Sequence, residues 1–207
     1  ADKAVLAKAL DYLKTRNAEI DEPYALALYG LASLDGGNPA IASGIAKQLE
    51  KMALTEDGAA YWNLETNTPF YGWGTAGRIE TTALVLQLLI RESAGDQPDA
   101  SRSDLISKGT LFLLKNKDRY GVWYSTQTTI NVLDAFLASL GTRRDSGPQS
   151  INIQINGRPL EPIVIAADRI DPVSVDLTDK LNAAENRVTL NGTADSALMS
   201  QVVASHY

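Results

Sequence analysis

Residues 80–92 read ETTALVLQLLIRE, and two other stretches of the chain repeat this pattern. EPYALALYGLASL begins at Glu22 and QTTINVLDAFLASL at Gln127, so successive starts are 58 and 47 residues apart. Each stretch begins with Glu or Gln and continues as a nearly unbroken run of Ala, Leu and Val, which predicts a helix buried on most of its surface. The spacing fits one pair of helices per repeat unit.

The segments between these stretches have one clearly polar face. They read VLAKALDYLKTR (5–16), IASGIAKQLEKM (41–52) and LISKGTLFLLKN (105–116), and each predicts an amphipathic helix. Half-exposed helices that alternate with buried ones predict an α/α toroid, in which an outer ring of helices surrounds an inner ring. Six helices make about half of a twelve-helix barrel. We therefore expect a partial toroid of three helical hairpins that exposes apolar surface at its first and last helices.

The character of the chain changes at GTRRDSGPQS (141–150), which predicts a linker. Alternating apolar residues beyond it predict strands, with Asn156-Gly157 and Asn191-Gly192 as turns. The expected strands cover 151–155, 162–166, 173–177, 186–192 and 199–205. The prediction is a mainly α chain with a β tail, formed by a partial toroid over 1–143 and a β-sandwich-like domain over 144–207.

Composition excludes several classes of function. A net charge of −6 and the lack of a basic patch argue against nucleic acid and anionic membranes as partners. No apolar run is long enough to insert into a membrane. The chain has no cysteine, which excludes disulfides, thiolate metal sites and cysteine nucleophiles, and its single histidine, His206, excludes paired-histidine metal motifs. We predict no metal, cofactor or catalytic residue.

Aromatic and acidic residues gather before the buried helices, and they leave two interpretations open. Tyr61-Trp62, Tyr71 with Trp73, and Tyr120 with Trp123-Tyr124 either plug one end of the ring or form a platform for a carbohydrate or terpenoid. Glu22 and Glu80 begin inner helices, with Glu56, Asp57 and Glu65 in a preceding loop. Converging carboxylates could hydrolyse glycosides, whereas acids in a first helical turn need only the helix macrodipole to explain them.

The stretch YGVWYSTQTTINVLDAFLASL (120–140) contains four hydroxyl residues, at 125, 126, 128 and 129. Behind an aromatic cluster they could be nucleophiles. At the start of a helix they have a simpler role, since Ser125 or Thr126 can accept a hydrogen bond from a free backbone N–H. Thr128 and Thr129 occupy the places where Glu or Gln would complete a capping box.

Taken in order, these segments resemble the C-terminal half of the thioester domain of the α2-macroglobulin and complement family. The most distinctive element is W-x-S-T-Q-x-T, formed here by Trp123, Ser125, Thr126, Gln127 and Thr129. The resemblance covers roughly residues 1–141. INIQINGRPL and the AENRVTLNG…SQVVASHY stretch look like the β segment that follows this domain, CUB-like or macroglobulin-like.

The resemblance implies a large secreted or periplasmic protease trap, in which cleavage of a bait region exposes a reactive thioester between a Cys and a Gln. This chain has no Cys, and His206 falls in the wrong segment to be the family's histidine, so no covalent-capture residue carries over. The chain is therefore either a piece of a thioester protein or part of a relative that lacks the thioester. The expectation is a non-enzymatic fragment of a broad-spectrum protease inhibitor, bacterial in source because it lacks cysteine. Its partners would be the remainder of the parent protein and target proteases, with self-association through the open ring edge where that remainder is absent. The alternative is an α/α-toroid enzyme or binding module that acts on carbohydrate or terpenoid.

Overall fold

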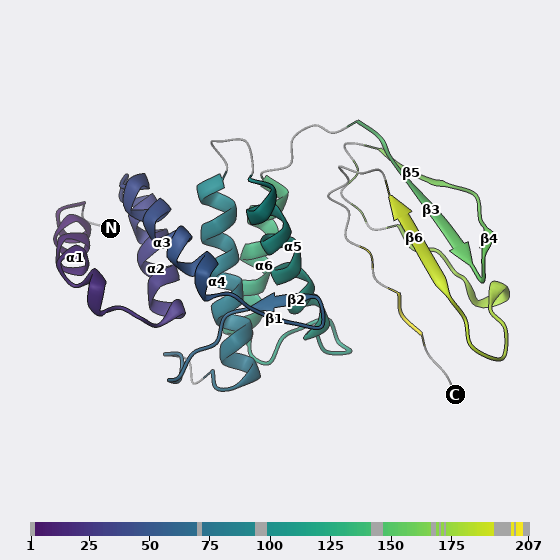
Figure 1. The fold of residues 1–207 in the computed structure, drawn as a ribbon, viewed down its shortest axis with the longest axis horizontal. Helices are drawn as coiled ribbons and strands as arrows, with labels where there is room; N and C mark the ends of the chain where they lie inside the picture. Colours follow the sequence, from purple (N-terminus) through teal and green to yellow (C-terminus); the bar gives the residue numbers. More distant parts are fainter. Residues whose placement is uncertain are drawn as a thin grey trace. The chain divides into compact units, whose positions relative to one another are not determined.

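The computed structural model describes residues 3–69, 72–93, 99–141, 147–166, 169, 171, 173–192, 200 and 202–204. The chain divides into two compact units, an α unit over 1–142 and a β unit over 143–207 (Figure 1). Among the described residues, no helix combines the length and the apolar character needed to cross a membrane.

The α unit contains all six of the expected helices. They are α1 (Lys3–Thr15), α2 (Pro23–Asp35), α3 (Pro39–Met52), α4 (Thr75–Ser93), α5 (Ala100–Lys115) and α6 (Thr126–Gly141), with a 3-10 helix, η1 (Asn17–Glu19), after α1. α4 contacts the inner helices α2 and α6 and the outer helices α3 and α5 (Figure 1). The tightest inner–outer pairs are α2 with α3 and α4 with α5. This is the arrangement of a partial helical toroid, as the repeat predicted.

Local sequence explains where these helices begin. Pro23 and Pro39 occupy the first turns of α2 and α3, where a missing N–H costs nothing. Asp99 caps α5 by accepting a 3.0 Å hydrogen bond from the Ser101 backbone N–H. Ser125 caps α6, because its Oγ accepts from the Thr128 backbone N–H at 3.1 Å. The cap expected at Ser125 or Thr126 is therefore confirmed, at Ser125.

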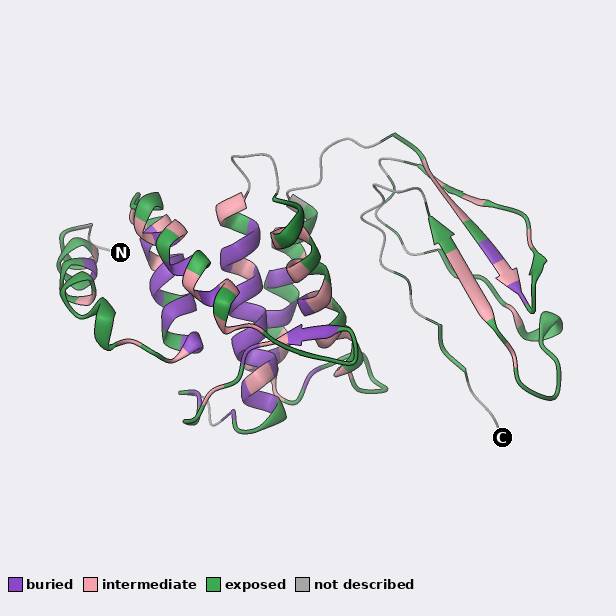
Figure 2. Ribbon diagram, viewed as in Figure 1, coloured by how far each residue is buried: buried purple, intermediate pink, exposed green. Residues whose placement is uncertain are grey.

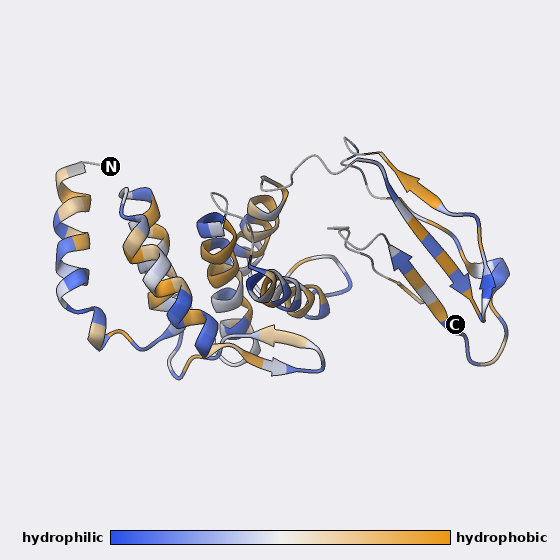
Figure 3. Cartoon of the chain, turned by 45° about the horizontal axis from the view of Figure 1, so that its top comes forward, coloured by the Kyte–Doolittle hydropathy of each residue, from blue (hydrophilic) through white to orange (hydrophobic). Residues whose placement is uncertain are grey.

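The core of the α unit lies along α4 (Figure 2). α4 is buried over nearly its whole length. On α1, by contrast, hydrophilic and apolar residues alternate around the helix (Figure 3). α6 differs from the other inner helices and from our expectation, because only one of its faces is buried. The opposite face exposes between 47 and 63% of each of four apolar residues: Ile130, Leu133, Leu137 and Leu140. Together with exposed Val5 and Tyr12 on α1, this confirms the apolar surface expected at the first and last helices.

A short hairpin between α3 and α4 was not predicted. β1 (Leu54–Glu56) pairs antiparallel with β2 (Ala59–Tyr61), and β2 packs on α5. Asp57 and Gly58 form the turn with positive φ angles of 49° and 75°. Asp-Gly is a strong signal for this kind of turn. The interpretation of Glu56 and Asp57 as loop residues was therefore wrong for Glu56, which lies in β1.

The described part of the β unit forms one antiparallel sheet. Its strands are β3 (Gln149–Ile155), β4 (Arg158–Pro159), β5 (Ile163–Ile165) and β6 (Val188–Gly192). β6 pairs with one edge of β3, and β4 and β5 pair with successive parts of the other edge. Asn156 and Gly157 form the expected turn, with φ angles of 53° and 79°. Ile153 and Ile155 of β3 are buried.

Two expectations for the β unit were wrong. Residues 173–177 form no strand and lead into a second 3-10 helix, η2 (Thr178–Lys180). Here the Asp176 carboxylate accepts from the backbone N–H and the hydroxyl of Thr178, at 2.9 and 2.6 Å, and such local bonds compete with strand pairing. Asn191 and Gly192 are not a turn, because they pair with Asn152 and Ile151 inside the sheet. Of 199–205, residues 200 and 202–204 are not in a strand, and the others lie outside the described residues.

Candidate functional site

Two tryptophans hold equivalent places in successive repeat units. The Trp62 indole N–H donates to the Leu49 carbonyl in the last turns of α3, at 2.7 Å. The Trp123 indole N–H donates to the Leu113 carbonyl in the last turn of α5, also at 2.7 Å. Each indole therefore satisfies a carbonyl near the C-terminal end of an outer helix, where carbonyls run short of helical partners.

The backbone of the same tryptophans marks the register of the repeat. The Trp62 N–H donates to Thr82 Oγ1 at 3.3 Å, and the Trp123 N–H donates to Thr129 Oγ1 at 3.0 Å. Thr82 is the third residue of the segment that begins at Glu80, and Thr129 is the third residue of the one that begins at Gln127. Residues that are 47 positions apart in these two segments therefore occupy equivalent places in the structure as well as in the sequence.

The exposure of each tryptophan tests the two interpretations of the aromatic loops, a plug at one end of the ring or a platform for a ligand. Trp62 is 0% exposed and Trp123 is 3% exposed, and both belong to the main core rather than to a separate plug. The Trp123 ring meets Phe136 edge-on, with 5.9 Å between ring centroids. Trp73 differs, because 64% of it is exposed. Tyr71 lies outside the described residues.

Glu80 is the most deeply buried acid of the α unit among the described residues, at 1% exposure. We expected Glu80 in the first turn of its helix. This was wrong, because α4 begins earlier, at Thr75. Thr128 Oγ1 donates to Glu80 Oε1 at 2.8 Å, and Thr128 Oγ1 lies 2.9 Å from Ser125 Oγ. Since the Thr128 proton points to the carboxylate, the Ser125 hydroxyl donates to Thr128. A chain of hydroxyls thus links the cap of α6 to a buried carboxylate in α4.

The second carboxylate oxygen of Glu80 faces a tightly packed loop. Oε2 has no hydrogen-bond partner among the described residues. A Cβ atom on Gly72 would lie 3.0 Å from this oxygen and 2.7 Å from Thr68 Oγ1, which accepts from the Gly72 N–H at 2.8 Å. Burial raises the pKa of Tyr24 on α2, and the negative charge of Glu80 raises it further. Glu80 therefore lies where the inner helices α2, α4 and α6 meet Thr68 and Gly72, and we call this group the Glu80 junction.

A family model described as the A-macroglobulin TED domain matches residues 1–138, two thirds of the 207 residues. The chain belongs to the α2-macroglobulin and complement family. The match covers the repeat, both buried tryptophans and the Glu80 junction, and it ends inside α6.

In this TED domain, the residues of the W-x-S-T-Q-x-T motif contact one another and the neighbouring helices. Thr129 Oγ1 binds the Trp123 backbone, accepting from its N–H and donating to its carbonyl at 3.0 Å. The Gln127 amide donates to Asn131 Oδ1 at 3.1 Å, and Gln87 of α4 donates to the Asn131 carbonyl at 2.9 Å. Thr126, the first residue of α6, is exposed. The motif thus joins the loop, the cap and the α4–α6 contact.

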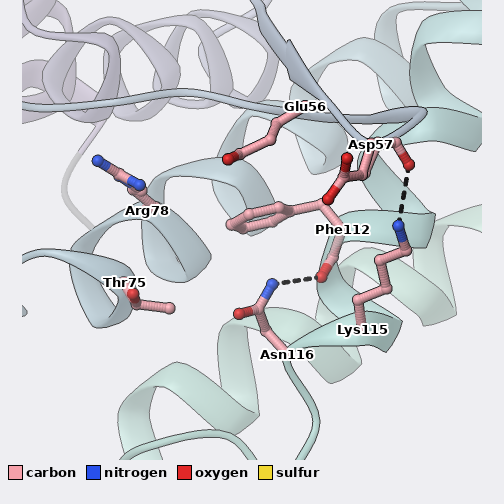
Figure 4. Close-up of a pocket in the computed structure, with 8 residues that line it drawn as sticks. Glu56, Asp57, Thr75, Arg78, Phe112, Lys115 and Asn116 are labelled. Carbon is pink, nitrogen blue, oxygen red and sulfur yellow. Dashed lines mark hydrogen bonds between the residues drawn. The ribbon is translucent and has the colours of Figure 1, made fainter.

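The other candidate acids are spread over the TED domain. Glu22 Oε1 accepts from the Glu65 backbone N–H at 3.3 Å and from the Thr66 hydroxyl at 3.2 Å, so it fastens the 65–66 loop to the start of α2. Glu56 and Asp57 line a small pocket beneath the β1–β2 hairpin (Figure 4).

Two positively charged side chains, Lys115 and Arg78, also line the pocket in Figure 4. Lys115 donates to the Asp57 carbonyl at 2.9 Å, and Arg78 lies 5.1 Å from the centre of the Tyr61 ring. No group of three or more acidic or histidine residues within the described ranges could hold a metal ion, and His206 lies outside them.

Sequence reasoning missed two features of the TED domain. The burial of Glu80 could have been inferred from its place in a segment that was expected to be buried on most of its surface. The second feature is Arg102 of α5, which pairs with Glu50 of α3 at 2.5 Å and also with Glu92 of α4. It joins three helices, and the sequence carries no local signal for contacts between residues this far apart.

Proposed function

We propose that this chain is a structural segment of a broad-spectrum protease inhibitor of the α2-macroglobulin type. Its family includes protease inhibitors, and members of the family are generally secreted and not enzymes. The match to the TED domain is the observation that carries this proposal. Because the 207 residues include no cysteine, this segment itself forms no thioester, and its role is to build and position the helical domain within the parent.

The Glu80 junction supports a mechanical role. A buried carboxylate that is held by a neighbouring helix fixes the positions of both helices, because any movement would leave a charge without its hydrogen bond. We propose that the junction keeps α2, α4 and α6 moving as one body when bait cleavage changes the shape of the parent inhibitor. The exposed stripes of α1 and α6 would then be the surfaces on which the remainder of the parent packs.

The test uses the parent inhibitor that contains this segment. Trapping is measured as protection of a bound protease from a large inhibitor while its activity on a small peptide substrate persists. We expect Thr128→Val to reduce trapping while Thr126→Val does not. A parent that never traps proteases, or that traps them equally well with both variants, would contradict the proposal.

Location and source are part of the same proposal. We place the parent outside the cytoplasm, in the periplasm or the extracellular space, because the family is generally secreted. The lack of cysteine favours a bacterial source, since extracellular domains of animals usually rely on disulfides. Fractionation of cells that express the parent tests the location directly.

Exposed aromatic residues support a second candidate, a carbohydrate-binding module. Trp73, Tyr120 and Tyr124 are 64, 73 and 79% exposed and precede two inner helices. Sugars stack on exposed aromatic rings because these offer a flat apolar surface. Binding on a glycan array that is lost with Trp73→Ala would favour this candidate, and a silent array would remove it.

A further inference from the structure

One Asn-Gly pair of the β unit lies in an exposed turn that the proposed function does not use. Asn156 and Gly157 connect β3 to β4, and both have positive φ angles. An Asn that precedes Gly is chemically labile, because glycine has no side chain to hinder attack of its backbone nitrogen on the Asn side chain. A Cβ atom on Gly157 would meet no described atom within 4 Å, so the position is open.

Three hydrogen bonds nevertheless fasten Asn156 to the segment just before β6. Its Nδ2 donates to Asn186 Oδ1 at 3.0 Å, and its Oδ1 accepts from the Arg187 backbone N–H at 2.8 Å. Its own backbone N–H donates to the Arg187 carbonyl at 2.8 Å. Both polar atoms of the Asn156 side chain are therefore held by residues 186–187. We call Asn156, Asn186 and Arg187 the asparagine clasp.

Asn186 is in turn held by backbone groups of its own turn. Its Oδ1 also accepts from the Asn182 N–H at 2.8 Å, and its Nδ2 donates to the carbonyls of Asn182 and Ala184 at 2.8 and 2.9 Å. Because two carbonyls occupy Nδ2, the oxygen must be the atom that faces Asn156. Asn186 is thus a fixed acceptor for the Asn156 amide.

We propose that Asn156 is a site of spontaneous deamidation, which the asparagine clasp keeps unreactive while the β unit is folded. In this reaction the Gly157 backbone nitrogen attacks Asn156 Cγ, the bond from Cγ to Nδ2 breaks, and ammonia leaves with the proton of the Gly157 amide. Water then opens the resulting succinimide to aspartate or isoaspartate. The side chain must first turn from residues 186–187 toward Gly157, so both of its hydrogen bonds must break before attack.

Deamidation makes the opening of the clasp permanent. An aspartate at position 156 has no N–H to donate, and its carboxylate faces Asn186 Oδ1, which also only accepts. Isoaspartate adds one carbon to the backbone and so disturbs the register of Ile155 with Arg158 across the turn. A modified chain therefore records that its clasp has opened. The inference concerns the β unit and is independent of the proposed inhibitor role.

The first test follows Asn156 in the 207-residue chain by peptide mapping and mass spectrometry during incubation at mildly alkaline pH. The synthetic peptide INIQINGRPL (151–160) is the reference without a clasp. We expect Asn156 to deamidate at least about tenfold more slowly in the folded chain than in the peptide, because two hydrogen bonds must break first. Equal rates in the two, or a peptide that does not deamidate, would overturn the proposal.

A pair of variants tests the clasp itself. Asn186→Ala removes the acceptor of Asn156 Nδ2 and should speed deamidation at Asn156 at least about threefold. Asn182→Ala is the matched control, because Asn182 binds Asn186 through backbone atoms that alanine keeps, so the rate should stay unchanged. Hydrogen exchange of the β3 and β6 amides verifies that the sheet persists. Equal rates at Asn156 in the two folded variants would contradict the proposal.

Asn186→Asp separates loss of the clasp from loss of the fold. Aspartate keeps an oxygen that accepts from the Asn156 amide but cannot donate to the carbonyls of Asn182 and Ala184. We expect a rate between those of the unchanged chain and of Asn186→Ala. If Asn186→Ala loses the sheet, the aspartate variant decides: a rate well below that of the peptide supports the clasp, and a rate equal to the peptide's refutes it.

Discussion

Thr128, in the first turn of α6, donates a 2.8 Å hydrogen bond to Glu80, an acid that is 1% exposed in the interior of α4. Buried carboxylates are tolerated when hydrogen bonds compensate for the water they lose. Here one oxygen has such a bond and the other has none among the described residues. Among the described residues, this single hydroxyl is therefore the donor that compensates Glu80 for its burial.

Replacing that hydroxyl should destabilise the α unit. Thr128→Val keeps the shape of the side chain and leaves Glu80 without a donor, so we expect the free energy of unfolding to fall by about 3 kcal/mol. Chemical denaturation followed by circular dichroism measures the change. Thr126→Val is the control, because Thr126 is exposed two residues earlier and should change stability by less than about 0.5 kcal/mol. Equal losses in both variants would mean that Glu80 draws no stability from Thr128.

Gly72 should tolerate no larger side chain. A Cβ atom there would lie 2.7 Å from Thr68 Oγ1 and 3.0 Å from Glu80 Oε2, so Gly72→Ala should cost about 1 to 3 kcal/mol. Gly44→Ala gives the opposite expectation, because Gly44 lies within α3 with open space around it. Alanine there should raise the melting temperature, with a gain of about 0.5 to 1 kcal/mol. A harmless Gly72→Ala would show that the loop can move away from Glu80.

The two buried tryptophans should respond alike to substitution. Trp62→Phe and Trp123→Phe each remove an indole N–H that satisfies an outer-helix carbonyl and leave a small void, so each should cost about 2 to 4 kcal/mol. Trp73→Phe should be nearly neutral, because 64% of Trp73 is exposed. Denaturation midpoints of the three variants provide the comparison. A large loss with Trp73→Phe would indicate that this residue is covered in solution.

Stability should fall in strong alkali partly because of Tyr24. Burial and the charge of Glu80 raise the pKa of Tyr24 above its ordinary value of 10.0. The unfolded chain therefore releases this proton at lower pH than the folded chain, and stability is lost as the pH rises from about 10 through the folded pKa. The ultraviolet absorbance of ionised tyrosine, followed during a pH titration, measures the shift. Tyr24→Phe should reduce the loss, and Glu80→Gln should lower the pKa of Tyr24 if the carboxylate contributes as described.

Much of the fold could be predicted from the sequence because its signals are local. Pro23 and Pro39 favour the first turns of α2 and α3 because they lack an N–H, and the Ser125 side chain caps α6, so each of these effects acts within one turn. The repeat that begins at Glu80 and Gln127 identified the inner helices, and the same register appears in the hydrogen bonds of Trp62 and Trp123. The strand expected at 173–177 failed because side-chain bonds of Asp176, which alternation of apolar residues does not reveal, satisfy the local backbone.

The sequence alone therefore determined the helical repeat, the β tail, the family motif and the lack of any thiol chemistry, since each depends on residue type and spacing along the chain. Only the tertiary structure decided that Glu80 is a buried junction, that Trp62 and Trp123 belong to the core while Trp73 does not, and which residues of α6 form its exposed apolar face. Those outcomes depend on which distant residue lies opposite each side chain. An apolar face is buried only when another element covers it, and the residues of a helix do not themselves show which element lies opposite.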